Sequence, residues 1–374
     1  MRYLTAGESH GEKIVVIVDG VPSGIGLSEK EIDFELKRRS KGPGRSSRQS
    51  EESNSAKIIS GVADGKTTGN PVCVEIENSF SETEVNHYVM RPGHADLPGV
   101  LKHNFEDAKN VSERASARET AARLVAGVIA KNMLAEFGVE VYGYVSQIGN
   151  VAMKDDPTNM NLPEMSAIAM SEVSCPDAKA SASMLKLIDR AEKAGDSLGG
   201  AVKLVAVGLL EGLGGYSQGD SRLDSKIAGA VASVPSVKEV SLGSASVMSQ
   251  NFGSDVSDFM HKSEGSIVRE TNFSGGLEGG MTNGMPLIVG AMVRPVPTLH
   301  KQHQTVDLEN GAEISWQSDR RSDVCVVPSV AVICESELAL CLANAYMDKF
   351  GHDAMCDIMP AVQAYKTRVK ERLS

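Results

Sequence analysis

This chain of 374 residues has few aromatic residues, and its basic residues are outnumbered by its acidic ones. Phe, Tyr and Trp make up only 4% of it, so Val, Ile, Leu, Met and Ala must fill the core. The formal net charge is −11 at pH 7, which repels nucleic acids and anionic membranes in general. A local cluster of cations therefore stands out against the charge of the whole chain.

Three sequence signals are also missing. No stretch reaches the roughly 18 apolar residues that span a membrane, and the first residues do not combine a cationic segment with an apolar run. The six cysteines form no C-x-x-C pair, and no His/Cys grouping has the spacing of a zinc site. We therefore expect a cytoplasmic protein with no bound metal, no membrane contact and buried, free thiols.

The hydrophobic pattern predicts both strands and helices. Strands are predicted over residues 13–19, 71–77, 201–210, 286–294 and 324–334. Helices are predicted over residues 28–39, 112–137, 178–194, 223–234 and 335–350, the first of them opened by a capping box, Ser28–Glu31. Strands and helices do not alternate strictly, so a simple parallel βαβ sheet is disfavoured. Residues 154–166 are the most loop-like, and no low-complexity linker divides the chain, which we expect to form one domain over residues 1–374.

A basic run between Lys37 and Arg48 is the most conspicuous cluster of charge. It holds six cations and no acid in twelve residues, with Gly-Pro-Gly at its centre. Guanidinium groups in such a loop bind phosphate and carboxylate well. A solvated charge run is the plainer interpretation, and a nucleic-acid patch is a third, although no aromatic residues interleave for base stacking.

Other segments carry the same ingredients of histidine, arginine and glycine. They are Gly7–Gly11 (GESHG), Arg91–Asp96 (RPGHAD), Glu113–Thr120 (ERASARET), Gly275–Gly284 and Arg294–Thr298. Glycines let the backbone approach a ligand closely, histidines exchange protons near neutral pH, and arginines bind anions. Taken singly, each histidine is more simply a structural one, and Glu113 and Glu119 are simply salt-bridge partners of Arg114 and Arg118. Together the segments indicate a site for a polyanionic small ligand.

Two common nucleotide sites are disfavoured by the same segments. The glycine-rich stretch 275–284 is neither G-x-x-x-x-G-K-[ST] nor G-x-G-x-x-G. An ATP-dependent kinase with a phosphate loop therefore lacks support, as does a dinucleotide-binding turn.

Seven segments in order resemble the motif set of the chorismate synthase family. They read GESHG, RPGHAD, ERASARETAAR, GDSLGG, TNFSGGLEGGMTNG, RPVPT and RSDVCVVP, and they run from Gly7 to Pro328. The resemblance implies an α+β fold, a β-α-β-α sandwich with central helices between two antiparallel sheets. It also implies a lyase of the shikimate pathway, which eliminates phosphate from 5-enolpyruvylshikimate-3-phosphate to give chorismate and requires reduced FMN.

The resemblance carries functional roles to particular residues. The catalytic matches are His10, which would protonate the departing phosphate, His94 near the flavin N1 region, and Asp323 helped by Ser9 at flavin N5. The substrate-binding matches are Arg39, Arg45, Arg48, Arg91 and Arg118. The cofactor-binding matches are Arg114, Ala115, Ser116, Gly279, Thr298 and Arg321, together with Pro235 and Ser236, which stand where the family has an Asn-Ala or similar pair, and Arg294, Pro295, Val296 and Pro297.

The family resemblance also implies partners. It implies a homotetramer, and a flavin reduced either by an external flavin reductase or with NADPH as an indirect reductant. The alternatives that stay open are an anion- or nucleic-acid-binding protein that uses the loop 37–48, and a catalytically silent member of the family.

Overall fold

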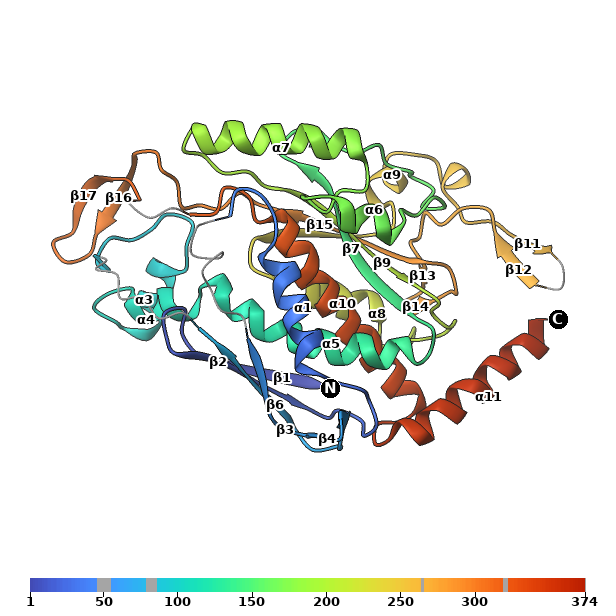
Figure 1. Cartoon of the computed structure of the whole chain (residues 1–374). Coiled ribbons are helices and arrows are strands. Elements are labelled where there is room, and N and C mark those ends of the chain that lie inside the picture. The colour runs from blue at the N-terminus through green and yellow to red at the C-terminus, as the bar shows by residue number, and fades with distance from the viewer. Residues whose placement is uncertain (46–54, 79–85, 264–265, 319–321, 374) are drawn as a thin grey trace.

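Two antiparallel sheets enclose a layer of helices in the computed structural model of the chain (Figure 1). The structure describes residues 1–45, 55–78, 86–263, 266–318 and 322–373. The first sheet has the strand order β1-β2-β6-β3, formed by β1 (Arg2–Ala6), β2 (Lys13–Asp19), β6 (Val72–Glu77) and β3 (Ala56–Ser60). Alternate residues of β2, namely Ile14, Val16 and Val18, are buried, which is the period expected of a strand with one covered face.

The central layer consists of α1 (Glu29–Ser40), α5 (Thr120–Ala135), α8 (Leu223–Ala232) and α10 (Val327–Phe350). α5 and α10 pack closely, because a Cβ added at Gly127 would lie only 2.3 Å from Cβ of Ser336. α10 is buried on nearly all sides from Val327 to Met347, as expected of a helix enclosed by other elements.

The second sheet has the order β10-β15-β9-β7-β8. Its strands are β10 (Val237–Leu242), β15 (Leu287–Val293), β9 (Gly200–Val207), β7 (Glu140–Ile148) and β8 (Val151–Ala152). Outside this sheet lie α6 (Met165–Met170), α7 (Ala178–Lys193) and α9 (Ala245–Met248), as Figure 1 shows. The fourth layer completes the β-α-β-α sandwich that the family resemblance implies.

Smaller elements project from these layers. They are β4 (Val62–Ala63), β5 (Lys66–Thr67), α3 (Asp96–His103), α4 (Lys109–Arg114), the 3-10 turn η1 (Ala117–Glu119), η2 (Gly253–Asp255), β11 (Met260–Ser263), β12 (Ser266–Arg269), β13 (Leu277–Glu278), β14 (Met281–Thr282), β16 (His303–Asp307), β17 (Ala312–Trp316) and α11 (Met355–Leu373).

A buried network of ion pairs joins the central helices. Glu335 on α10 accepts two hydrogen bonds from Arg38 on α1, at 2.7 and 2.9 Å, and pairs with Lys131 on α5 at 2.8 Å. Glu35 pairs with the same two cations. Burial alone would raise the pKa of Glu335, but Lys131 and Arg38 outweigh it and lower the pKa to about 2.

Several predicted elements are confirmed. The capping box is present, because Ser28 Oγ accepts from the backbone N–H of Glu31 and the Glu31 carboxylate accepts from Ser28 N–H. The strands predicted over 13–19, 71–77, 201–210 and 286–294 correspond to β2, β6, β9 and β15, and the helices over 178–194 and 223–234 to α7 and α8. All six cysteines are free as expected, but only Cys175, Cys325 and Cys334 are buried; Cys73 and Cys341 are half-buried and Cys356 is exposed, contrary to the expectation.

Two predicted elements are wrong. Residues 324–334 do not form a strand, because α10 begins at Val327 with Pro328 in its first turn, where a missing N–H costs nothing. The long helix predicted over 112–137 is broken at Ser116 and resumes at Thr120. α10 is also long and apolar enough to cross a membrane, but 89% of its apolar window is buried inside the protein, as in a core helix.

Candidate functional site

The turn between β1 and β2 places His10 beside Glu113. Gly7 adopts a φ of +112°, and a side chain there would meet the carbonyl oxygen of Lys13 at 2.5 Å, so the position requires glycine. Nδ1 of His10 lies 2.6 Å from Oε1 of Glu113, and the backbone N–H of His10 donates to Oε2 at 2.8 Å. The backbone N–H of Ser9, which is buried, donates to the carbonyl of Glu113 at 3.1 Å.

Asn78 connects this turn to Arg118. Its side-chain amide donates to the carbonyl oxygens of Ser9 and Gly11, at 2.9 and 2.8 Å. Its Oδ1 accepts from Nε of Arg118 at 2.9 Å, and Arg118 also donates to the carbonyl of Glu77. The end of β6 thus brings a site arginine against the histidine turn.

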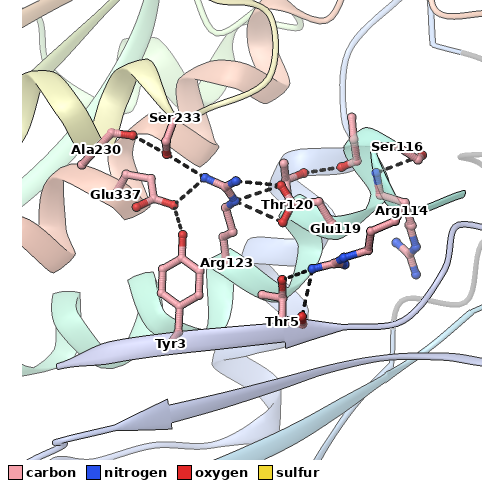
Figure 2. A network of polar contacts seen from close by, with 12 residues as sticks. Tyr3, Thr5, Arg114, Ser116, Glu119, Thr120, Arg123, Ala230, Ser233 and Glu337 are labelled. Carbon is pink, nitrogen blue, oxygen red and sulfur yellow. Dashed lines mark hydrogen bonds and ion pairs between the residues drawn. The ribbon is translucent and has the colours of Figure 1, made fainter. Parts of the chain in front are cut away.

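The residues between α4 and α5 are tied to β1, as Figure 2 shows. Arg114 Nη2 donates to the carbonyl and the hydroxyl of Thr5, at 2.9 and 2.6 Å. Ser116 caps η1, because its Oγ accepts from the backbone N–H of Arg118, and Ala115 is exposed just before it. The three residues expected at the cofactor therefore lie next to the His10 turn.

Arg123 carries this polar network into the protein (Figure 2). Its guanidinium donates to Glu119, to Ser233 Oγ at 2.8 Å and to Glu337 at 3.2 Å. Tyr3 donates to Glu337 at 2.6 Å; burial and this carboxylate raise the pKa of Tyr3, so the phenol keeps its proton. The network anchors the helix end that precedes Pro235 and Ser236.

A second histidine, His94, is held by uncharged groups. Its Nδ1 lies 3.1 Å from the carbonyl of Pro92, and its Nε2 lies 2.9 Å from Thr298 Oγ1. Because a carbonyl only accepts, Nδ1 carries the proton and the Thr298 hydroxyl donates to Nε2. Burial, with the charges of Arg91 and Arg294, lowers the pKa of His94, which keeps the ring neutral at pH 7.

Arg91 and Arg294 surround this histidine with positive charge. Arg91 is fixed by a bidentate pair with the buried carboxylate of Asp96, at 2.7 and 2.8 Å. Arg294 donates to the carbonyl of Gly93 at 2.7 Å, and its backbone N–H donates to the carbonyl of Ser236 at 2.9 Å. Its Nε is buried and has no hydrogen-bond partner among the described residues.

The segment that begins at Ser322 completes the group. Ser322 donates to the carbonyl of Thr298 at 2.8 Å. Asp323 forms an ion pair with Arg45 at 3.1 Å, and Val324 N–H donates to the carbonyl of Gly44 at 2.7 Å. The basic loop after α1 is thereby drawn against the N-terminal end of α10.

The basic run itself is divided between structural and site roles. Arg38 belongs to the buried network with Glu335. Arg39 is 3% exposed and donates to Thr120 Oγ1 and to the carbonyl of Ala117, both at 2.9 Å, so it braces the start of α5. These two cations of the run are therefore committed to contacts inside the fold.

Two of the predicted site residues, Arg48 and Arg321, lie outside the described residues. Gly279 lies near Thr282, which contacts Gly212 and so the C-terminal end of α10, where Lys349 also donates to Gly212. A helix of 24 residues is roughly 36 Å long, so Gly279 lies far, within one chain, from Arg45 and Asp323 at the N-terminal end of α10.

The sequence pattern predicts no functional role for Asn78 or Asp96, and for Glu113 it predicts only a salt bridge to a neighbouring arginine. Asn78 directly follows a predicted strand and Asp96 ends the RPGHAD motif, but neither spacing tells which side chain a residue will meet. Their partners come from segments up to 103 residues away.

Two other kinds of site, a metal centre and a separate cavity, come into question among the described residues. Among the described residues, no group of three or more His, Cys, Asp or Glu side chains could hold a metal ion. A cavity of about 550 Å³ lies between the second sheet and residues 153–164, lined by Tyr144, Asp155 and Lys203. None of the site histidines and arginines lines it, so it is separate from the candidate site.

Comparison with known proteins gives a consistent result. The family model described as chorismate synthase matches residues 1–347. A chorismate synthase of Desulforudis audaxviator is 42% identical, covering 99% of this chain and 98% of that protein, and one of Bacillus subtilis is 40% identical, covering 99% and 100%. A solved crystal structure of chorismate synthase superposes with a TM-score of 0.81 at 34% identity, covering 99% of this chain and 98% of that one.

Proposed function

The chain belongs to the chorismate synthase family, and we propose that its reaction takes place among the loops that carry His10, His94, Arg45 and Asp323. The enzyme is a lyase that makes chorismate by a 1,4-elimination of phosphate from 5-enolpyruvylshikimate-3-phosphate. The family requires a reduced flavin, and we propose that this flavin is FMN. One observation supports this placement above the others. The 3.1 Å ion pair of Arg45 with Asp323 holds the basic loop after α1 against the segment that begins at Ser322, which in turn contacts Thr298.

The arginines bind the substrate in this proposal. The substrate carries a phosphate and two carboxylates, so several fixed guanidinium groups are needed to offset its charge. Arg45, Arg91 and Arg118 are each held by a hydrogen-bonded partner, which sets their direction before the ligand arrives. Arg39, near the C-terminal end of α1, and Arg48, which lies outside the described residues, complete the proposed set.

The residues at the proposed flavin position fit an anionic, hydrogen-bonding cofactor. The buried Nε of Arg294 lacks a partner among the described residues, and a bound acceptor would satisfy it. The proposed flavin contacts are Arg114, Ala115, Ser116, Pro235, Ser236, the segment from Arg294 to Thr298 through Pro295, Val296 and Pro297, and Arg321. A reduced flavin supplies electron density for the elimination, while the protein orients the substrate and moves protons.

The two histidines have different proton roles. His10, paired with a carboxylate, is the proposed acid that protonates the departing phosphate. His94 is neutral with its proton on Nδ1, so it presents a basic nitrogen toward Thr298 at the flavin segment. Asp323, assisted by Ser9, is the proposed proton acceptor at flavin N5.

We propose the remaining properties on family grounds. They are a homotetramer, a cytoplasmic location, one domain over residues 1–374, and reduction of the flavin from outside, either by a flavin reductase or with NADPH as the indirect reductant.

Three substitutions test the placement of the site. His10→Ala and His94→Ala should each lower kcat by orders of magnitude while the protein stays folded, and Arg45→Ala should raise KM for the substrate. The measurement is steady-state chorismate formation under anaerobic conditions with reduced FMN, with circular dichroism as the check on folding. Near-normal kcat in either histidine variant, or an unchanged KM for Arg45→Ala, would remove the corresponding role.

A further inference from the structure

We propose that Glu113 is a positioning residue for His10: it fixes the orientation of the imidazole and keeps its proton on Nδ1. The nitrogen that donates to the departing phosphate is then Nε2: the doubly protonated ring gives up its Nε2 proton and returns to the neutral tautomer with the proton on Nδ1. This inference rests on the proposed function of His10, and nothing in the family comparison assigns a role to Glu113.

Glu113 holds residues 9 and 10 at three points. Its Oε1 lies 2.6 Å from Nδ1 of His10, its Oε2 accepts from the His10 backbone N–H at 2.8 Å, and its own carbonyl accepts from Ser9 N–H at 3.1 Å. The two side chains are partly buried, with exposed fractions of 15% for Glu113 and 20% for His10. A surface ion pair of two mobile side chains would not engage both the ring and the backbone of the same residue.

The chemistry of the carboxylate fixes the tautomer. An ionised carboxylate has acceptors only, so the nitrogen facing it must carry a proton. The choice of which ring nitrogen is protonated is set by the partner of the other nitrogen, and a carboxylate at Nδ1 is the arrangement that orients a histidine acid–base catalyst. The carboxylate also offsets the positive charge that His10 acquires whenever Nε2 takes up a proton.

The position of Glu113 is determined by elements on both sides of it. Glu113 lies on α4. The next residue of the same helix, Arg114, donates to Thr5 and to the carbonyl of Gly7. Asn78, which directly follows β6, donates to the carbonyls of Ser9 and Gly11 in the histidine turn. The histidine turn is therefore clamped between α4 and the end of β6, and a small displacement of either partner would misdirect the ring.

His94 has no such carboxylate, which makes the arrangement at His10 specific. Its ring nitrogens meet a carbonyl and a hydroxyl, and the charges that act on it are those of Arg91, of Asp96, which is paired with Arg91, and of Arg294. The site thus contains one histidine paired with an anion and one kept neutral, which suits an acid and a second group of different role.

Glu113→Gln is the decisive variant because it keeps the shape and reverses the hydrogen bond. The amide oxygen can still accept from the His10 backbone N–H, as Oε2 does now, and the amide NH₂ then faces Nδ1. Nδ1 must then accept, and the ring proton moves to Nε2. We expect kcat to fall by roughly 10- to 1,000-fold, with KM for the substrate changed less than about twofold.

Nitrogen-15 NMR of labelled protein reads the tautomer directly. The His10 signal among the eight histidines is assigned by its loss in His10→Asn. In the wild type the neutral ring should show a protonated Nδ1, and in Glu113→Gln a protonated Nε2. Glu113→Asp keeps the carboxylate on a shorter arm, so it should retain the wild-type tautomer with an intermediate kcat. Glu136→Gln, at an exposed position after α5, is the matched control and should match the wild type in both readouts.

The outcomes separate this inference from the proposed function. Wild-type kcat and an unchanged tautomer in Glu113→Gln would overturn the positioning role. A wild-type enzyme that makes no chorismate would refute the proposed function, whereas the NMR comparison would still decide whether Glu113 sets the tautomer. Should Glu113→Gln fail to fold, Glu113→Asp decides: a protonated Nε2 in that variant would overturn the inference, and a protonated Nδ1 with lowered kcat would support it.

Discussion

Replacing Glu335 by Gln should destabilise the fold strongly although the side chain keeps its size. The new amide would retain one acceptor for Arg38 and Lys131, and its NH₂ would face donors, including the backbone N–H of Gly143 that now donates to Glu335 at 2.9 Å. Removing one member of a buried ion pair typically costs about 3–5 kcal/mol.

The lowered pKa of Glu335 fixes the pH dependence of this loss. A carboxyl group whose pKa is lowered in the folded state stabilises the protein fully above its unfolded value of 4.5, and loses that contribution as the pH falls toward 2. The difference in unfolding free energy between wild type and Glu335→Gln should therefore be constant from about pH 7 to 5 and shrink below pH 4.5.

Urea denaturation followed by circular dichroism measures this difference. Asp189→Asn is the matched control, because Asp189 pairs with Lys193 at 2.6 Å on an exposed face, where such pairs contribute about 0–1 kcal/mol. A loss below about 1 kcal/mol in Glu335→Gln at pH 7, or a difference that grows on acidification, would refute the role assigned to this network.

Three further outcomes are expected. An NMR titration should show the His94 midpoint below 6.5 in the wild type and a higher one in Arg91→Gln; a wild-type midpoint at or above 6.5 would contradict the lowered pKa. Asn78→Ala should lower kcat about 10- to 100-fold by releasing the histidine turn, and unchanged kinetics would show that the turn holds itself. Gly127→Ala should cost about 1–3 kcal/mol in thermal unfolding because the added methyl meets Ser336, whereas Gly229→Ala on α8, with open space around it, should stabilise; equal effects would argue against close packing of α5 and α10.

Local signals in the sequence predicted a large part of the fold. The capping box at Ser28 and the alternating pattern of residues 13–19 depend on neighbours in the chain, and both are confirmed. The apolar run 324–334 predicts a strand, but α10 begins within it. A helix that is buried on every side has no polar face, so its sequence lacks the 3.6-residue alternation that identifies a helix. The arrangement of the layers came from the resemblance of seven motifs and not from periodicity.

The sequence predicts which types of residue form the site, but it does not predict which residues contact one another there. The sequence indicates that His10, His94 and the arginines serve one ligand, and this stays a prediction. The structure shows contacts within two groups, one around His10 and one around His94. Which arginines are structural could not be read from the sequence, because the partner of Arg38, Glu335, is 297 residues away. The carboxylate that meets His10 was likewise decided by tertiary packing.

The most direct test of the central claim is an anaerobic assay of the wild-type protein. Purified protein is mixed with photoreduced FMN and 5-enolpyruvylshikimate-3-phosphate, and chorismate absorbance is followed together with released phosphate. We predict that both products appear in equal amounts, and that neither appears with oxidised FMN. Folded protein that binds FMN yet releases no phosphate would contradict the claim that this site carries out the elimination.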